Sequence, residues 1–346
     1  MSQFVPISPE VSPARLKTTD KRIRRCLELE KGVPMEVWPI DERKKIAEKI
    51  RYLSDSYYNH STDIDYSSKH TQIAYAIAYY PNYVEGLTQI LELINLQETG
   101  LQNVTDFSDS LYKSWASYFH QQKRQRLNVV FFGSGPAPEL YSFKRFLDFL
   151  YRQAKLPDEE YIPQVSVDLF EMEQAWEWSL ENVTKSLMNH ERLPSYRKMN
   201  INFQQDDLTK PFSSIAKQLK QEYHLIFLQN LANEIPRSDQ ETRSFINNLK
   251  LFIGRLKPGV GYCVVASRGY QHLGVNDLIR DYVEQEESLE FVIEGLRIDL
   301  NADHQEGEDP KLKNYIYSEV PWNYRRFDYR RFDNNSVVFA IKSVVK

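Results

Sequence analysis

The chain has 346 residues, of which 41% are hydrophobic and 27% are charged, and its formal net charge is −4. This mixture is typical of a globular protein with a sizeable core, and the mildly negative balance excludes a chain that binds polyanions over its whole surface. Two cysteines, Cys26 and Cys263, are too few for a disulfide framework and have no metal-binding spacing. We therefore expect a cytoplasmic protein without a metal site.

Two missing patterns narrow the class of protein further. Apolar runs fall short of the ~20 residues that a membrane-spanning helix needs. Residues 1–13 lack the basic stretch followed by an apolar stretch that is typical of a secretory signal. We expect neither membrane insertion nor secretion through a standard signal.

The first third of the chain has a helical pattern. Apolar residues between positions 40 and 122 recur at helical spacing, and glycine is scarce there. We therefore predict a helical module over residues 1–125. Residues 1–35, which contain three early prolines, are expected to begin as an extended arm. The basic residues within 21–25 are expected to form a solvated helix face, with a nucleic-acid-binding arm as the alternative.

From residue 126 onward, predicted strands alternate with predicted helices. Helical patterns cover residues 140–150, 238–257 and 273–282. The alternation predicts an open α/β sheet over residues 126–346. No helical pattern separates the last two strands, which are therefore expected to form a hairpin. Short apolar runs indicate strands at residues 127–132, 165–170, 201–204, 225–228, 261–266, 291–300 and 336–345.

The ends of the first two predicted strands carry residues that suit a nucleoside ligand. Ligands of open α/β sheets bind outside the carboxyl ends of the strands. Residues 133–135, Gly-Ser-Gly, follow the first strand, and glycine lets the backbone turn there with positive φ. Glu171 ends the second strand, where a carboxylate can accept hydrogen bonds from both ribose hydroxyls. Asp168, on the same strand, is the second choice for this role.

The third predicted strand is also followed by acidic residues. Asp206 and Asp207 come directly after it. A carboxylate at this position can accept a hydrogen bond from an adenine amino group. The alternative is a helix N-cap next to Leu208 and Thr209. The sequence leaves both interpretations open.

Together these features resemble the class I S-adenosylmethionine-dependent methyltransferase family. The resemblance covers residues 127–346 and rests on the segments VVFFGSGPAPE, VDLFE, FQQDDLTKPF, LIFLQNLANEI and LKPGVGYCVVASR. It implies a Rossmann-like, seven-stranded methyltransferase sheet, S-adenosyl-L-methionine as cofactor, and transfer of its methyl group to an acceptor. The cofactor-binding residues that it implies are Gly133, Ser134, Gly135, Glu171, Met172, Asp206, Asp207, Gln229 and Asn230.

A narrower resemblance concerns one subgroup of this family. The segment AYAIAYYPNYVEGL, the GSGP turn and the acid of Asn233-Glu234 resemble the ribosome-assembly methyltransferase-like proteins of the mitochondrial small subunit. The metal-binding cysteines of that subgroup have no counterpart in this chain. We retain only the broader family as the expected class.

The chain departs from the family pattern at several positions. Phe131 stands where family members often carry an acid, Ala137 replaces the third glycine, and His224 replaces an acid before the fourth strand. A catalytically inactive methyltransferase-like protein that binds a partner is therefore the alternative function. An NAD-type oxidoreductase is disfavoured, because Pro138 and Glu139 stand where the GxGxxG pattern needs its third glycine.

Methyl transfer itself requires little side-chain chemistry. The sulfonium carries its own leaving group, so the protein mainly holds the reactants in line. Glu234 is the best candidate for a substrate-facing group, with an ordinary helix-start acid as the alternative.

A doubled sequence near the carboxyl terminus bears on the identity of the methyl acceptor. The run YRRFDYRRFD places Arg325, Arg326, Arg330 and Arg331 among aromatic rings. Such a strip can contact phosphates and stack on bases, which favours an RNA acceptor. The alternative is that these arginines pair with nearby acids, and a protein acceptor would then dock on the helical module.

Overall fold

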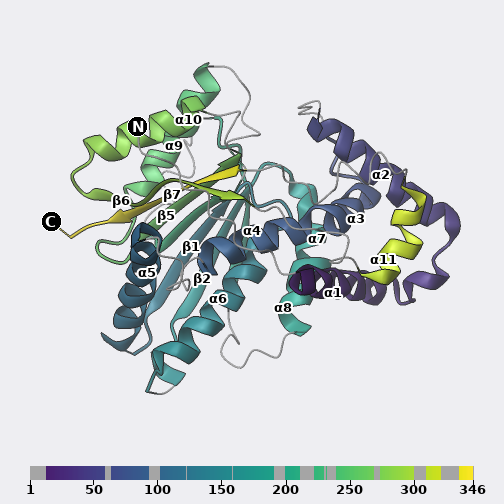
Figure 1. Cartoon of the computed structure of the whole chain (residues 1–346), viewed down its shortest axis with the longest axis horizontal. Helices are drawn as coiled ribbons and strands as arrows, with labels where there is room; N and C mark the ends of the chain where they lie inside the picture. Colours follow the sequence, from purple (N-terminus) through teal and green to yellow (C-terminus); the bar gives the residue numbers. More distant parts are fainter. Residues whose placement is uncertain are drawn as a thin grey trace.

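The computed structural model describes most of the chain as helices around one mixed sheet (Figure 1). The described residues are 13–58, 64–92, 102–121, 123–157, 159–190, 199–210, 222–229, 231, 239–268, 273–299, 309–320 and 335–345. None of the helices within these ranges is long and apolar enough to cross a membrane.

The sheet has seven strands in the order β3-β2-β1-β4-β5-β7-β6. The first five strands along the chain pair in parallel, whereas β7 pairs antiparallel with both β5 and β6. The strands are β1 Arg126–Phe132, β2 Gln164–Glu171, β3 Met199–Gln205, β4 Leu225–Gln229, β5 Tyr262–Arg268, β6 Leu289–Asp299 and β7 Asn335–Ser343. The predicted fold class, a Rossmann-like methyltransferase sheet with N-terminal helices, is confirmed.

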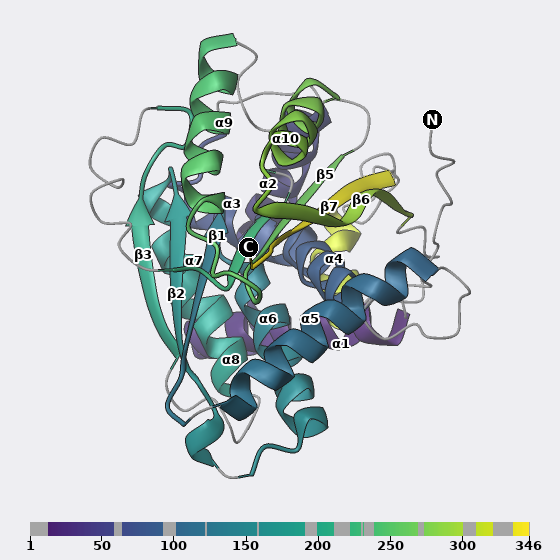
Figure 2. The ribbon, with the colours of Figure 1, turned by 90° about the vertical axis from the view of Figure 1, so that its left-hand side faces the viewer.

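Helices cover both faces of this sheet (Figure 2). The longer helices are α1 Pro13–Lys31, α2 Ile40–Tyr58, α3 Lys69–Ala78, α4 Tyr80–Glu92, α5 Gln102–Gln121, α6 Pro138–Ala154, α9 Asp239–Ile253 and α10 Leu273–Gln285. The shorter ones are η1 Met35–Val37, η3 Glu159–Tyr161, η4 Gln174–Trp176, α7 Glu177–Ser179, η5 Leu180–Lys185, α8 Ser186–His190, α11 Pro310–Tyr315 and η9 Tyr317–Glu319. The π-helical turn η5 connects α7 directly to α8.

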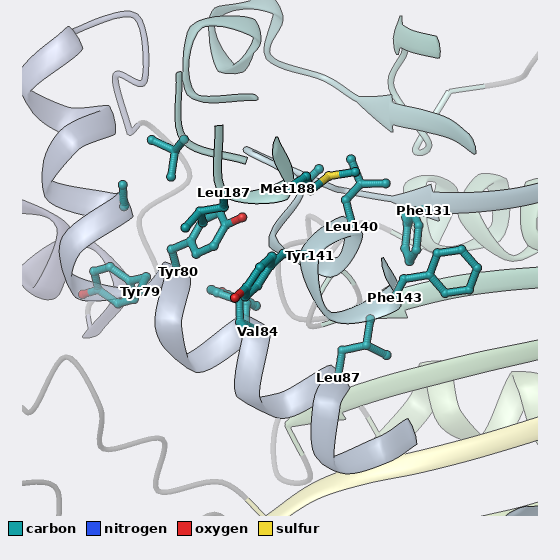
Figure 3. Packing of buried hydrophobic residues seen from close by; sticks show 14 of the residues in the cluster. Tyr79, Tyr80, Val84, Leu87, Phe131, Leu140, Tyr141, Phe143, Leu187 and Met188 are labelled. Carbon is teal, nitrogen blue, oxygen red and sulfur yellow. The ribbon is translucent and has the colours of Figure 1, made fainter. Parts of the chain in front are cut away.

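Alternating residues of the strands enter two separate cores. On β1, Val129 and Phe131 join a cluster that includes α4, α6 and the N-terminal helices, whereas Val130 and Phe132 join a cluster with α9 and α10. Figure 3 shows the first cluster, in which Phe143 of α6 lies next to Phe131. This alternation follows from the two-residue period of a strand that is buried on both faces.

Helix α1 begins at Pro13, and residues 1–12, where the predicted extended arm would start, lie outside the described ranges. Proline is tolerated in the first turn of a helix, where its missing N–H has no intrahelical partner in any case. Ile23, Cys26 and Leu27 then recur at helical spacing and are fully buried. Burial of this apolar face explains why the segment forms a helix.

The basic run of α1 is divided between solvent and the fold: Lys21 and Arg25 are exposed, as predicted, whereas Arg22 is half-buried and Arg24 is buried. Arg24 is buried and forms ion pairs with Glu28 at 2.7 Å and with Asp309 at 3.1 Å. Asp309 caps α11 by accepting a hydrogen bond from the backbone N–H of Lys311. The side chain of Arg22 also donates to the hydroxyl of Tyr141. The contact between α1 and α11 therefore depends on buried, paired charges.

The last two strands are neighbours in the sheet, as predicted, but their connection is not a simple hairpin. The helix α11 and the turn η9 lie between β6 and β7 in the chain. Leu312, Ile316 and Tyr317 from this connection are buried in the same cluster as the N-terminal helices. The chain thus leaves the sheet to pack against α1 and η1 and returns as β7.

Candidate functional site

The glycine turn after β1 has a left-handed backbone at three positions. Gly133 has φ +57°, Gly135 has φ +48° and Ala137 has φ +56°. A Cβ atom on Gly133 would lie 2.6 Å from Cδ1 of Leu231, so glycine is needed there for packing as well as for backbone freedom. A Cβ atom on Gly135 would meet the ring of Trp176 at an ordinary contact distance of 3.7 Å. Gly135 is therefore constrained by its backbone conformation alone.

Glu171 joins the end of β2 to this turn. Its carboxylate accepts hydrogen bonds from the backbone N–H of Gly135 at 2.7 Å and of Glu173 at 3.1 Å. Burial raises the pKa of Glu171, the backbone N–H donors lower it, and the charge of Glu173 raises it, with a net upward shift. A carboxylate has about four acceptor positions, so capacity for further donors remains.

Asp168 has a different environment from Glu171, although it lies on the same strand. It pairs in register with Val130, inside the sheet. Its carboxylate accepts from the side-chain amide of Asn202 at 3.2 Å and from the hydroxyl of Tyr223 at 3.3 Å. The structure therefore places Glu171, and not Asp168, at the carboxyl end of β2 beside the glycine turn.

The two acids after β3, Asp206 and Asp207, have different hydrogen-bond partners. Asp207 accepts from the backbone and hydroxyl of Thr209 and pairs with Lys210, and these partners outweigh burial and lower its pKa. Asp207 thus caps the turn that follows β3. The pKa of Asp206 is raised by burial, and its backbone N–H donates to the carbonyl of Glu171 at 2.9 Å. Asp206 is the acid that lies next to Glu171.

Met172 is an exposed apolar residue at this edge of the sheet. It is 54% exposed, although Glu171 before it accepts a hydrogen bond from the turn and Glu173 after it donates to Glu171. Its carbonyl accepts from the side-chain amide of Gln205. Gly135, Glu171, Met172 and Asp206, all predicted site residues, are therefore brought together by direct contacts between neighbouring segments.

Gln229 ends β4, next to β1 in the sheet. Phe132 pairs with Leu228, which places Gln229 level with Gly133. A Cβ atom on Gly86 of α4 would lie 2.5 Å from Nε2 of Gln229, so the glycine makes room for this amide. Sequence reasoning missed Gly86, because nothing in the local pattern of α4 indicates a contact with a distant strand.

Three buried polar atoms near the glycine turn have no hydrogen-bond partner among the described residues. They are Oγ of Ser134, Oε2 of Glu139 and Oε1 of Gln229. Ser134 and Glu139 are 2% and 4% exposed. Buried polar groups are nearly always hydrogen-bonded, so these three atoms make the surroundings of the glycine turn a candidate place for a polar ligand.

Glu139 was not predicted as a site residue. It lies in the first turn of α6, directly after the glycine turn. Burial is the main cause that raises its pKa, to about 8; its own backbone N–H lowers the pKa, and the charge of Glu171 raises it. A carboxylate in the first helical turn behind a strand–glycine-turn unit is the sequence signal that could have identified it.

Several predicted residues lie outside the described ranges. These are Asn230, Glu234 and the arginines of the doubled sequence, Arg325, Arg326, Arg330 and Arg331. Their roles stay predictions. Among the residues that the structure does describe, no group of three or more His, Cys, Asp and Glu side chains forms a metal-binding cluster. Cys26 and Cys263 are buried free thiols.

The residues present fit S-adenosylmethionine, the group that the fold class implies. The donor set combines a strand-end carboxylate, an exposed apolar side chain, a second acid and orphaned polar atoms around a glycine turn. These match the ribose hydroxyls, purine ring, purine amine and amino-acid end of an adenosyl amino acid. This fit is based on the chemistry of these groups and on their positions at the ends of three neighbouring strands.

Methyltransferases of known structure are similar to this chain at low identity. An rRNA methylase from Streptococcus thermophilus is 9% identical, with 68% of this chain and 97% of that chain covered and a TM-score of 0.36. A loganic acid methyltransferase with S-adenosylhomocysteine is 11% identical, with 79% and 96% covered and a TM-score of 0.38. A TehB-like SAM-dependent methyltransferase from Corynebacterium glutamicum is 11% identical, with 76% and 99% covered and a TM-score of 0.30. No model of a protein family and no curated protein matches the sequence.

Proposed function

We infer that this protein is an S-adenosyl-L-methionine-dependent methyltransferase, with residues 126–346 as the cofactor-binding domain and residues 1–125 as a helical module. One observation carries the inference: the carboxylate of Glu171 closes the Gly133–Gly135 turn through the N–H of Gly135 at 2.7 Å. This contact puts a strand-end acid and a glycine turn at one edge of the sheet, the arrangement that binds nucleosides in doubly wound folds.

Each neighbouring strand end supplies one part of the proposed cofactor site. Glu171 accepts hydrogen bonds from the ribose, and exposed Met172 packs against the purine. Asp206 accepts from the purine amine and is held next to Glu171 by a 2.9 Å hydrogen bond. Gln229 is proposed to bind the amino-acid end, and the role of Asn230 there stays a prediction. Asp207 is excluded from this set because its oxygens are used by Thr209 and Lys210.

The reaction would require positioning more than acid–base chemistry. S-adenosyl-L-methionine supplies a methyl group on a sulfonium, whose neutral sulfide is a good leaving group. The chain's contribution is to fix the nucleoside through Glu171 and the glycine turn, so that an acceptor meets the methyl group in line. Glu234 is the proposed group that faces the acceptor and takes its proton where one must be lost.

The acceptor is proposed to be RNA or protein. Arg325, Arg326, Arg330 and Arg331 would contact RNA phosphates, in which case affinity falls steeply with salt. Neutralising two of them should lower the log–log salt slope by about two. A stability loss without any change in RNA binding would instead favour paired arginines and a protein acceptor.

A calorimetric titration with S-adenosylhomocysteine tests the proposed function. Glu171→Ala should weaken binding by roughly 30- to 150-fold, because a charge-assisted contact is lost. Asp168→Ala, the matched control three residues away, should leave the affinity nearly unchanged. No binding by the wild-type protein at millimolar ligand would overturn the proposal. Binding without methyl transfer to RNA or protein fractions would favour the inactive, partner-binding alternative.

A further inference from the structure

The unpartnered carboxylate oxygen of Glu139 has a defined place relative to the proposed cofactor site. Glu139 lies one turn before Phe143 on α6, and the ring of Phe143 contacts that of Phe131 on β1 at 5.9 Å between centroids. Residues four apart share one face of a helix. Glu139 therefore lies on the sheet-facing side of α6, at the end nearest the glycine turn.

Electrostatic interactions link the same carboxylate to the end of β2 and to α4. Glu139 interacts with Glu171 at the end of β2 and with Tyr80 on α4. Tyr80 in turn interacts with Tyr141 on α6 and Cys26 on α1, and its hydroxyl is bonded to Thr184. Tyrosine, cysteine and threonine side chains carry no positive charge, so these neighbours offer Glu139 no cation.

A buried acid in this setting favours one kind of ligand group. An isolated carboxylate is costly to bury unless a cation or several donors complete it. The partners of Glu139 in the described chain are its own backbone N–H and the like charge of Glu171. The other orphaned atoms nearby, Oγ of Ser134 and Oε1 of Gln229, can also accept hydrogen bonds from a cationic donor.

We propose that Glu139 is the counterion for the α-ammonium group of the bound adenosyl amino acid. The proposal rests on the proposed function and adds a binding residue to it. It assigns the two acids of the site to different parts of one ligand: Glu171 binds the ribose, and Glu139 binds the ammonium. Ser134 and Gln229 supply the remaining acceptors for the ammonium protons.

Binding of the ammonium group at Glu139 should be coupled to the release of a proton. A carboxyl group with a pKa of about 8 is mostly protonated at pH 7. When the ammonium binds, the carboxyl proton is released to the buffer and the carboxylate pairs with the cation. Binding of the adenosyl amino acid should therefore release close to one proton at pH 7 and become tighter as the pH rises toward 8.

Two ligands separate this proposal from the proposed function. S-adenosylhomocysteine carries the α-ammonium, whereas 5′-methylthioadenosine has the same nucleoside and sulfide without the amino-acid end. The full chain is titrated with each ligand by calorimetry, in two buffers of different ionisation enthalpy. Glu139→Gln keeps the shape of the side chain and removes its charge. Asp148→Asn, a buried acid farther along α6, is the matched control.

The expected result is selective. Glu139→Gln should weaken S-adenosylhomocysteine binding by about 10- to 150-fold, leave 5′-methylthioadenosine binding within about threefold, and abolish proton release. Asp148→Asn should leave the affinity for both ligands unchanged. Equal binding of S-adenosylhomocysteine by wild type and Glu139→Gln overturns the proposal while the nucleoside site stands. Equal losses for both ligands overturn it as well, because the effect would then be structural. Absence of binding of either ligand to the wild type overturns the proposed function and this inference together.

Discussion

Two buried polar regions of this molecule differ in how their atoms are partnered. Where α1 meets α11, Arg24 is paired with Asp309 at 3.1 Å. Around the glycine turn, oxygens of Ser134, Glu139 and Gln229 have no partner among the described residues. Buried groups that are paired stabilise the fold, whereas buried groups left unpaired are retained at a cost to stability. We infer that the Arg24–Asp309 pair stabilises the fold and that the three oxygens around the glycine turn are available to a ligand.

Replacing Arg24 should produce the largest loss of folding free energy. Arg24→Met leaves the carboxylate of Asp309, whose side chain is 5% exposed, without its cation. Removing one partner of a buried ion pair costs about 3–5 kcal/mol. Chemical denaturation should show this loss, and the dissociation constant of S-adenosylhomocysteine should stay unchanged. A loss below about 0.5 kcal/mol, typical of ordinary surface changes, would contradict the structural role.

The pH dependence of stability should depend on Glu139. Burial raises its pKa from 4.5 to about 8, so the folded chain holds a proton that the unfolded chain releases between these values. Its contribution to stability therefore decreases as the pH rises from about 4.5 to about 8. Glu139→Gln removes this slope and should gain on the order of 3–4 kcal/mol relative to wild type between pH 5 and pH 8. Parallel stability curves for the two proteins would show that Glu139 does not titrate in this window.

Asp168→Ala should affect stability and not ligand binding. The substitution leaves the Tyr223 hydroxyl and the Asn202 amide without their acceptor, at a cost of about 1–3 kcal/mol. Thermal and denaturant unfolding would measure the loss. If Asp168→Ala instead lowers the affinity for S-adenosylhomocysteine more than Glu171→Ala does, the ribose role belongs to Asp168.

The smallest expected loss of folding free energy concerns two glycines. Comparing them distinguishes the cost of a left-handed backbone from the cost of close packing at the glycine turn. Gly32→Ala introduces a Cβ at φ +70° with nothing within 4 Å, so it should cost only about 1 kcal/mol for the left-handed backbone. Gly133→Ala has a similar φ and a Cβ 2.6 Å from Leu231, so its cost should be larger by roughly 1–2 kcal/mol. Equal losses in denaturant unfolding would show that Leu231 moves aside freely.

Much of the sheet and part of the site could be predicted from local sequence patterns. Buried strands followed by turn residues have a short-range signal, and Glu171 follows from its place at the end of one such strand. The connection between β6 and β7 had no comparable signal, because α11 is short and is stabilised by its contact with Arg24. The start of helix α1 was not predicted, because early prolines suggested an extended arm, whereas Ile23 and Leu27 are buried against distant helices.

Gly86 and Glu139, the two site residues that were not predicted, escaped prediction for the same physical reason. Gly86 is needed because the Gln229 amide, far along the chain, lies 2.5 Å from where its Cβ would be. Beyond its place in the first turn of α6, Glu139 is distinctive through its burial and its interaction with Glu171. Both properties arise from tertiary packing between α4, α6 and the sheet. A single sequence contains no periodic signal for such contacts.

Hydrogen–deuterium exchange of the full chain, with and without saturating S-adenosylhomocysteine, tests the central claim most directly. The N–H of Gly135 and Glu173 already donate to Glu171, and a nucleoside bound there should shield this part of the backbone further. We predict slower exchange in residues 133–139 and 171–176, and unchanged exchange in residues 13–31 of α1. Protection of α1 with no change at the glycine turn, or no protection anywhere in the chain, would contradict the account.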